Sequence, residues 1–133
     1  MEKLKIIIAN KNTNNKFLLS VKFFSENKET EEFVFGNSTK SLERVGLLIT
    51  DQDNNEIFPS GITMIVPIES KKKSHQISKD VFFEYLIKGT IEDSGDKMLL
   101  DLGVIKYFLE KETDYNFIIR FRGATSNIIS MSF

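Results

Sequence analysis

One segment near the C-terminal end of the chain constrains the fold more than any other. Its large apolar residues recur at every second position, at Tyr115, Phe117, Ile119 and Phe121. A strand directs successive side chains to opposite faces of its sheet, so these residues share one face. The opposite face carries Asn116, Arg120 and Arg122, with Ile118 as an apolar exception. The spacing predicts a β-strand with one face in a core.

The same two-residue period recurs along the rest of the chain. The clearest further examples are residues 16–25 and 81–91, and shorter pieces lie at residues 4–8, 33–35, 45–50, 62–68 and 128–133. Residues 98–109 are ambiguous and fit a short strand followed by a loop. Turn residues separate these pieces roughly every 8–12 positions, and no 3.6-residue stripe marks an amphipathic helix. We therefore expect an all-β fold.

The length and composition fit one folded domain. The chain has 133 residues, of which 41% are hydrophobic and 28% are charged. That balance is typical of a globular domain that buries a core, and nothing in the sequence marks a linker or a repeat. Twelve phenylalanines and no tryptophan indicate a core of phenylalanine and branched aliphatic residues. We expect a single domain over residues 1–133.

A wider pattern around the C-terminal strand resembles that of fibronectin type III and other immunoglobulin-like domains. It consists of Leu109, Thr113, Tyr115, Phe117 and Ile119. In that family the tyrosine hydroxyl forms a hydrogen bond to the backbone a few residues upstream. The resemblance implies an immunoglobulin-like Greek-key β-sandwich of about seven to nine strands. Because the cysteine pair and the core tryptophan are missing, an antibody-type domain is excluded.

A second resemblance covers more of the chain. Residues 17–23, 46–67 and 115–133 are similar to the small β-sandwich that precedes the catalytic domain of deuterolysin-type metallopeptidases. The zinc motif of those enzymes is absent, so the resemblance implies a fold and brings no catalytic residues.

The charge and the cysteine count exclude several classes of function. With 18 basic and 19 acidic residues, the chain has no electrostatic footprint for nucleic acid. It has no cysteine, so disulfides and thiolate sites are excluded. No apolar run reaches the length of a membrane helix or a signal peptide. As it stands, the sequence predicts a soluble cytoplasmic protein, or an exported one if an upstream signal was removed.

Catalytic motifs are missing as well. His75 is the single histidine, and no nucleophile elbow accompanies it. Carboxylates such as Asp93 and Glu110 fall in turns, where we expect them to be solvated. The run at residues 71–75 is basic and reads as a solvated loop, with contact to phosphate or an acidic partner as its alternative. We expect no enzyme activity and no cofactor.

One turn resembles half of a calcium loop. Asp51, Asp53 and Asn55 alternate as the first ligands of such a loop do. The sixth position is Glu56 instead of glycine, and the twelfth is Ile62 instead of glutamate. These residues also favour tight turns, so we expect a hairpin turn. The alternative is a weak cation site in a ligand- or carbohydrate-binding sandwich.

The remaining candidates concern a partner surface. Phe24 and Phe82 share the parity of charged residues and would be apolar anchors on an exposed sheet face. Arg120 and Arg122 would either form a basic stripe on the sheet surface or pair with acids on a neighbouring strand. Of these two arrangements, we expect the cross-strand pairing. The function that fits is a non-catalytic protein-interaction module acting through a sheet face, an edge strand or end loops. A homo-oligomer formed through a sheet edge is compatible with it.

Overall fold

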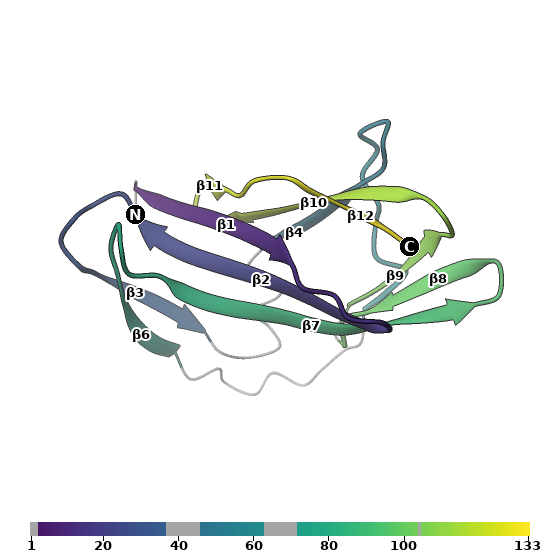
Figure 1. Ribbon diagram of the computed structural model, residues 1–133, viewed down its shortest axis with the longest axis horizontal. Coiled ribbons are helices and arrows are strands. Elements are labelled where there is room, and N and C mark those ends of the chain that lie inside the picture. Colours follow the sequence, from purple (N-terminus) through teal and green to yellow (C-terminus); the bar gives the residue numbers. More distant parts are fainter. Residues whose placement is uncertain (1–2, 37–45, 63–71, 104) are drawn as a thin grey trace.

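The computed structural model describes residues 3–36, 46–62, 72–103 and 105–133. Within these ranges the chain is all-β, which confirms the predicted class (Figure 1). The N-terminal strands are β1 (Leu4–Asn10), β2 (Lys16–Ser25), β3 (Glu31–Gly36), β4 (Leu47–Thr50), β5 (Gly61–Ile62) and β6 (Lys72–Ile77). The C-terminal strands are β7 (Phe83–Ser94), β8 (Lys97–Asp101), β9 (Ile105–Glu110), β10 (Asp114–Phe121), β11 (Ala124–Thr125) and β12 (Ile129–Ser132). In the described part of the chain, no helix is long and apolar enough to cross a membrane.

The larger sheet has the order β1-β2-β7-β8-β9-β5, with every neighbouring pair antiparallel. Strand β2 lies inside it and has the alternation that its sequence predicts. Its inward residues, all at most 1% exposed, are Phe17, Leu19, Val21 and Phe23. The ambiguous residues 98–109 form both β8 and β9. The expected loop there is wrong, because Tyr107 and Leu109 are inward residues of a strand paired with β8.

The smaller sheet is built around β10, which is formed by the segment of the sequence that most constrains the fold. Strand β4 pairs with one edge of β10, and β12 and β11 pair with the other. Its inward residues are buried as predicted and are Tyr115, Phe117, Ile119 and Phe121. In Figure 1 this sheet lies above β2 and β7, so the two sheets form layers.

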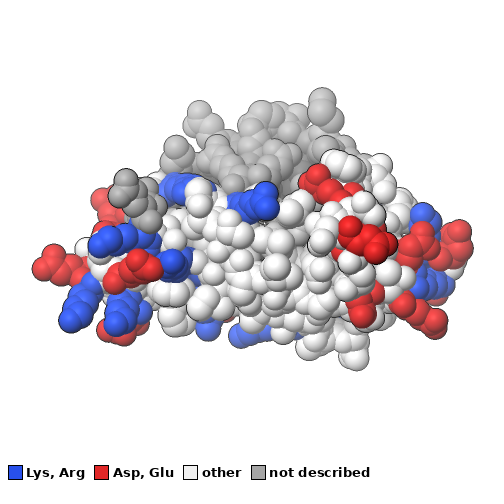
Figure 2. All heavy atoms as spheres, turned by 90° about the horizontal axis from the view of Figure 1, so that it is seen from above, with Lys and Arg blue, Asp and Glu red and all other residues white. Residues whose placement is uncertain are grey.

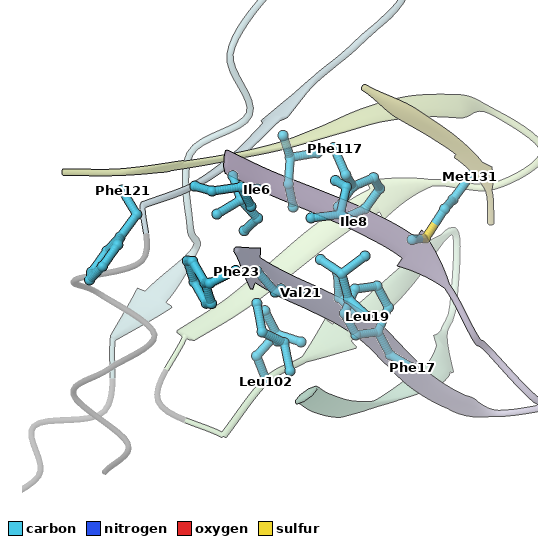
Figure 3. Packing of buried hydrophobic residues seen from close by; sticks show 14 of the residues in the cluster. Ile6, Ile8, Phe17, Leu19, Val21, Phe23, Leu102, Phe117, Phe121 and Met131 are labelled. Carbon is cyan, nitrogen blue, oxygen red and sulfur yellow. The ribbon is translucent and has the colours of Figure 1, made fainter. Parts of the chain in front are cut away.

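The core fills the space between the layers. Phe17 of β2 and Phe117 of β10 meet with ring centroids 5.9 Å apart. Figure 3 shows Ile6, Ile8 and Leu19 reaching toward Phe117 from the opposite sheet. Burial of apolar area on this scale is the main favourable term in folding a domain of this size.

A two-stranded ribbon, β3 with β6, packs at one end of the core. Phe33 and Phe35 of β3 contact Phe23, Phe83 and Phe121, with ring centroids between 5.0 and 6.1 Å apart. This aromatic cluster joins the ribbon to both sheets.

Strand β6 corrects an expectation, because the basic run at residues 71–75 is predicted to be a solvated loop, whereas residues 72–75 of that run lie in this strand. The residues of β6 are mostly polar, and of the side chains that the structure describes there, at residues 74–77, Ile77 is the one that is buried. The strand exists because its backbone pairs with β3, with His75 opposite Phe33, while the phenylalanines of β3 supply the apolar contacts. Of the strand expected at residues 62–68, only Ile62 lies in the described ranges, where it ends β5. The rest of that expected strand and Lys71 of the basic run lie outside the described ranges.

A β-bulge lets Asn127 tie the two sheets together. The pairing of β10 shifts by one residue between β12 and β11, which leaves two residues, Asn127 and Ile128, opposite Ile118. The Asn127 amide turns toward β1, where its Oδ1 accepts the backbone N–H of Ile8 at 2.7 Å. Its Nδ2 donates to the Ile8 carbonyl at 3.1 Å. The side chain thus satisfies backbone groups on the outer edge of β1.

The turn between β9 and β10 contains the hydrogen bond that the immunoglobulin-like resemblance implies. The hydroxyl oxygen of Tyr115 accepts the backbone N–H of Glu110 at 2.8 Å, five residues upstream. Tyr115 is buried, at 3% exposed. This expectation from the sequence is therefore confirmed at the level of the contact itself.

Replacing Tyr115 with phenylalanine is expected to lower the free energy of unfolding by about 1 kcal/mol, and by up to about 3 kcal/mol if the abandoned N–H stays dry. The ring and its burial remain, so the loss isolates the hydrogen bond. Chemical denaturation measures it. Tyr107→Phe is the matched control, because Tyr107 is also buried but its hydroxyl has no hydrogen-bond partner among the described residues. Equal midpoints for both variants would contradict a structural role for the Tyr115 hydroxyl.

Candidate binding surface

The two predicted aromatic anchors lie on the outer face of the larger sheet. Phe82, just before β7, is 53% exposed, and the Lys22 Nζ lies 4.6 Å from the centre of its ring. Phe24 is half-buried and lies opposite Lys5 in the pairing of β1 and β2. A lysine thus lies beside each phenylalanine, which agrees with the charged parity that the sequence assigns to both.

The two predicted arginines belong to the other sheet, so the structure does not join them with the aromatic pair into one site. Arg122 covers the aromatic cluster, with its guanidinium carbon 4.8 Å from the Phe121 ring centre and 5.3 Å from that of Phe33. It also donates to the Val34 carbonyl at 2.7 Å. Its φ of 48° lies in the left-handed region, which costs an arginine strain that these contacts offset.

The expected pairing of these arginines with acids is not found among the described residues. Arg122 is held by rings and a carbonyl, and Arg120 extends from the exposed end of β10. Sequence parity assigned both to the outer face, but it could not show that the hairpin turn folds Arg122 back over Phe33 and Phe121.

The outer face of the smaller sheet is uncharged over its centre. Pairing places Thr50 and Ser130 on either side of Asn116, and Leu48 beside Ile118. The bulge adds Ile128, which is 63% exposed. We refer to the following residues as the central face: Leu48, Thr50, Asn116, Ile118, Ile128 and Ser130. Within it the Ser130 hydroxyl donates to Asn116 Oδ1 at 3.0 Å.

Charges of opposite sign mark the two ends of the central face. Asp114 and Arg120 have the same parity on β10 as Asn116 and Ile118, and both are exposed. An oxygen of Asp114 accepts the hydroxyl of Ser132. Neither charge forms an ion pair with a described residue. Figure 2 shows a broad area free of Lys, Arg, Asp and Glu between two ends that each carry basic and acidic side chains.

The chemistry of the central face suits contact with another surface. It offers apolar area from three aliphatic residues and neutral hydrogen-bonding groups from Thr50, Asn116 and Ser130, and none of its residues is ionisable. The buried centres of protein interfaces are depleted in charged residues in the same way. Sequence analysis found one member of this surface, Ile118, as an apolar exception. The others became neighbours only through strand pairing.

The Asp51 turn has its carboxylate engaged within the turn. Asp51 Oδ1 accepts the backbone N–H groups of Asp53 and Asn55, each at 2.9 Å, and Oδ2 accepts the Asn55 side-chain amide at 3.2 Å. These bonds, first among them that from the Asn55 backbone, hold the pKa of Asp51 below its usual value. Among the residues that the structure describes, no group of three or more His, Cys, Asp or Glu residues could hold a metal ion.

Millimolar calcium is therefore expected to leave the melting temperature of the protein unchanged. Binding to the folded state would raise it, because a ligand that prefers the native state stabilises that state by mass action. Thermal denaturation with calcium and with a chelator measures the effect. A rise that the chelator reverses would show that the turn opens to bind the cation.

The remaining sequence candidates take part in local structure. The His75 ring stacks on Phe83, with centroids 3.8 Å apart, at the edge of the aromatic cluster. Asp93 pairs with Lys111 at 2.9 Å, which lowers the pKa of that carboxyl, and Glu110 pairs with Lys97 at 3.3 Å.

Comparisons of the chain with protein-family models, with curated proteins and with solved structures find no match.

Proposed function

We propose that this chain is a non-catalytic protein-interaction module that binds a protein partner through the central face. The observation that carries the proposal is a sheet face with no charged residue at its centre and an isoleucine, Ile128, that is 63% exposed. Covering such a face with a partner contributes favourable free energy, at roughly 25 cal/mol per Å² of apolar area removed from water. Its neutral polar groups supply hydrogen bonds that fix the register of a partner.

We further propose that the fold is a variant of the immunoglobulin-like sandwich. Two features support this assignment: β10 lies between β4 and β12 as the sixth strand of that family lies between the third and seventh, and Tyr115 bonds to the backbone before it. One feature departs from the family. The strand beyond β7 in the larger sheet is β8, which follows β7 in sequence, whereas the family's strand in that place precedes it.

The outer face of the larger sheet is a weaker candidate for the same function. Ile7, Phe82 and Phe108 are 41% to 53% exposed there. Charged side chains lie among them, and the Lys22 amine already covers the Phe82 ring. Predicted anchors Phe24 and Phe82 belong to this face, so it serves as the matched control for the central face.

Affinity capture with three baits tests the proposal. The baits are the wild type, Ile118→Asp on the central face, and Phe82→Asp on the larger sheet. A protein retained by the wild type and by Phe82→Asp, but lost with Ile118→Asp, is the expected result. Loss with Phe82→Asp alone would move the site to the larger sheet.

Folding of the baits is checked separately, because Ile118 is half-buried. Circular dichroism and melting curves of the purified variants should match those of the wild type. If Ile118→Asp melts early, Ser130→Lys is the second variant, since Ser130 is exposed and a lysine there places a charge on the same surface. Retention of every protein by a folded Ser130→Lys would contradict the proposal.

A further inference from the structure

The residues on the outward face of β10 have a charge pattern that complements the same pattern on a second β10 strand running the opposite way. From one end to the other it reads acid, neutral, apolar, base, in the order Asp114, Asn116, Ile118 and Arg120. The two charges lie six residues apart, which is about 20 Å along a strand. Neither charge is paired with another described residue of its own chain.

Resting on the proposed function of the central face, we infer that this face binds a second copy of the chain, with the β10 strands of the two copies antiparallel. A two-fold axis that lies in the interface and crosses the strands produces this arrangement. It places Asp114 of each copy against the partner's Arg120, so the dimer gains two ion pairs by symmetry. The parallel arrangement would place like charges together and is disfavoured.

The surface between the charges suits this packing. Sheets that pack face to face lie about 10 Å apart and keep their strands within about 30° of one another. The aliphatic row of Leu48, Ile118 and Ile128 crosses the strands one residue away from the two-fold axis. The aliphatic rows of the two copies therefore lie beside each other, one on each side of the axis. The charges at both ends are exposed and form the polar rim that typical interfaces have.

The charge pattern also argues for a second copy over an unrelated protein. An unrelated partner would need its own acid and base at the matching separation, whereas a second copy supplies both by symmetry. The net charge of −1 sets little repulsion against association of two copies.

Sedimentation velocity over a range of protein concentrations tests the inference with charge-reversal variants. The wild type should pass from monomer to dimer as concentration rises. Asp114→Arg and Arg120→Asp, each alone, place two like-charged contacts in the dimer. Each should raise the dissociation constant of the dimer about tenfold or more. An equimolar mixture of the two single variants should form a heterodimer, and the double variant should recover the wild-type constant.

The outcomes separate this inference from the proposed function. A wild type that stays monomeric at millimolar concentration overturns self-association, as does a dimer that both single variants leave unchanged. If the affinity capture still distinguishes Ile118→Asp from Phe82→Asp in that case, the central face binds a different protein and the proposed function stands. Circular dichroism confirms that each variant is folded, and Lys88→Asp on the larger sheet controls for a change in net charge alone.

Discussion

Replacing Phe23 with alanine is expected to lower the free energy of unfolding by about 3–5 kcal/mol. Phe23 is fully buried on β2 and lies where the ribbon meets both sheets. Its ring centroid is 5.0 to 6.2 Å from those of four others, Phe33, Phe35, Phe83 and Phe121. Truncation removes these contacts and leaves a cavity that three separate elements would have to close. A domain of this size has a total stability of only about 5–15 kcal/mol, so much of it is lost.

Phe24→Ala is the control, because Phe24 is the next residue and directs its side chain to the outer face. It is half-buried, so its loss should cost clearly less than that of Phe23. Urea denaturation of both variants measures the difference. A larger loss for Phe24→Ala would contradict the register of β2, since a one-residue slip exchanges the two faces of a strand.

Replacing Gly89 with alanine is expected to destabilise the fold by about 1–3 kcal/mol through overpacking. Gly89 lies in β7 opposite Phe17, with an inward parity. A Cβ atom there would lie 2.4 Å from the backbone oxygen of Asp101 and 2.7 Å from Leu102 Cδ2. The oxygen belongs to the neighbouring strand β8, so relief requires that the backbone itself move.

Thr90→Ala in the same strand is the control, since Thr90 is exposed and its truncation creates no contact. Thermal denaturation should separate the two variants by several degrees for a domain of this length. Equal melting temperatures would show that β7 and β8 do not approach each other as closely as the structure has them.

The fold could be predicted where alternating apolar residues fill one face of a strand. Residues 16–25 and 115–121 are such strands, and their inward rows are the inward rows of β2 and β10. Strand β6 could not be predicted because the stabilising contacts come from β3, a separate segment about 40 residues away. For residues 98–109, the dividing turn depends on a short Asp-x-Gly signal, in which Asp101 Oδ1 accepts the Gly103 N–H at 2.8 Å and Gly103 has a φ of 89°. The alternation of apolar residues did not locate this turn.

The candidate surface could be predicted only in part. Parity assigned Ile118, Arg120 and Phe82 to outer faces, because side-chain direction follows from position in a strand. It could not show which outward residues become neighbours, since the pairing of β10 with β4 and β12 joins segments about 70 and 15 residues apart. The fate of Arg122 depended on a two-residue turn and on the distant ring of Phe33.

The most direct test of the central face is hydroxyl-radical footprinting. Oxidation of side chains is compared between the chain alone at low concentration and the complex it forms, with itself or with a captured protein. The central-face account predicts that oxidation of Ile118 and Ile128 falls in the complex while that of Phe82 and Phe108 is unchanged. Protection of Phe82 and Phe108, with Ile118 and Ile128 oxidised as in the free chain, would contradict it.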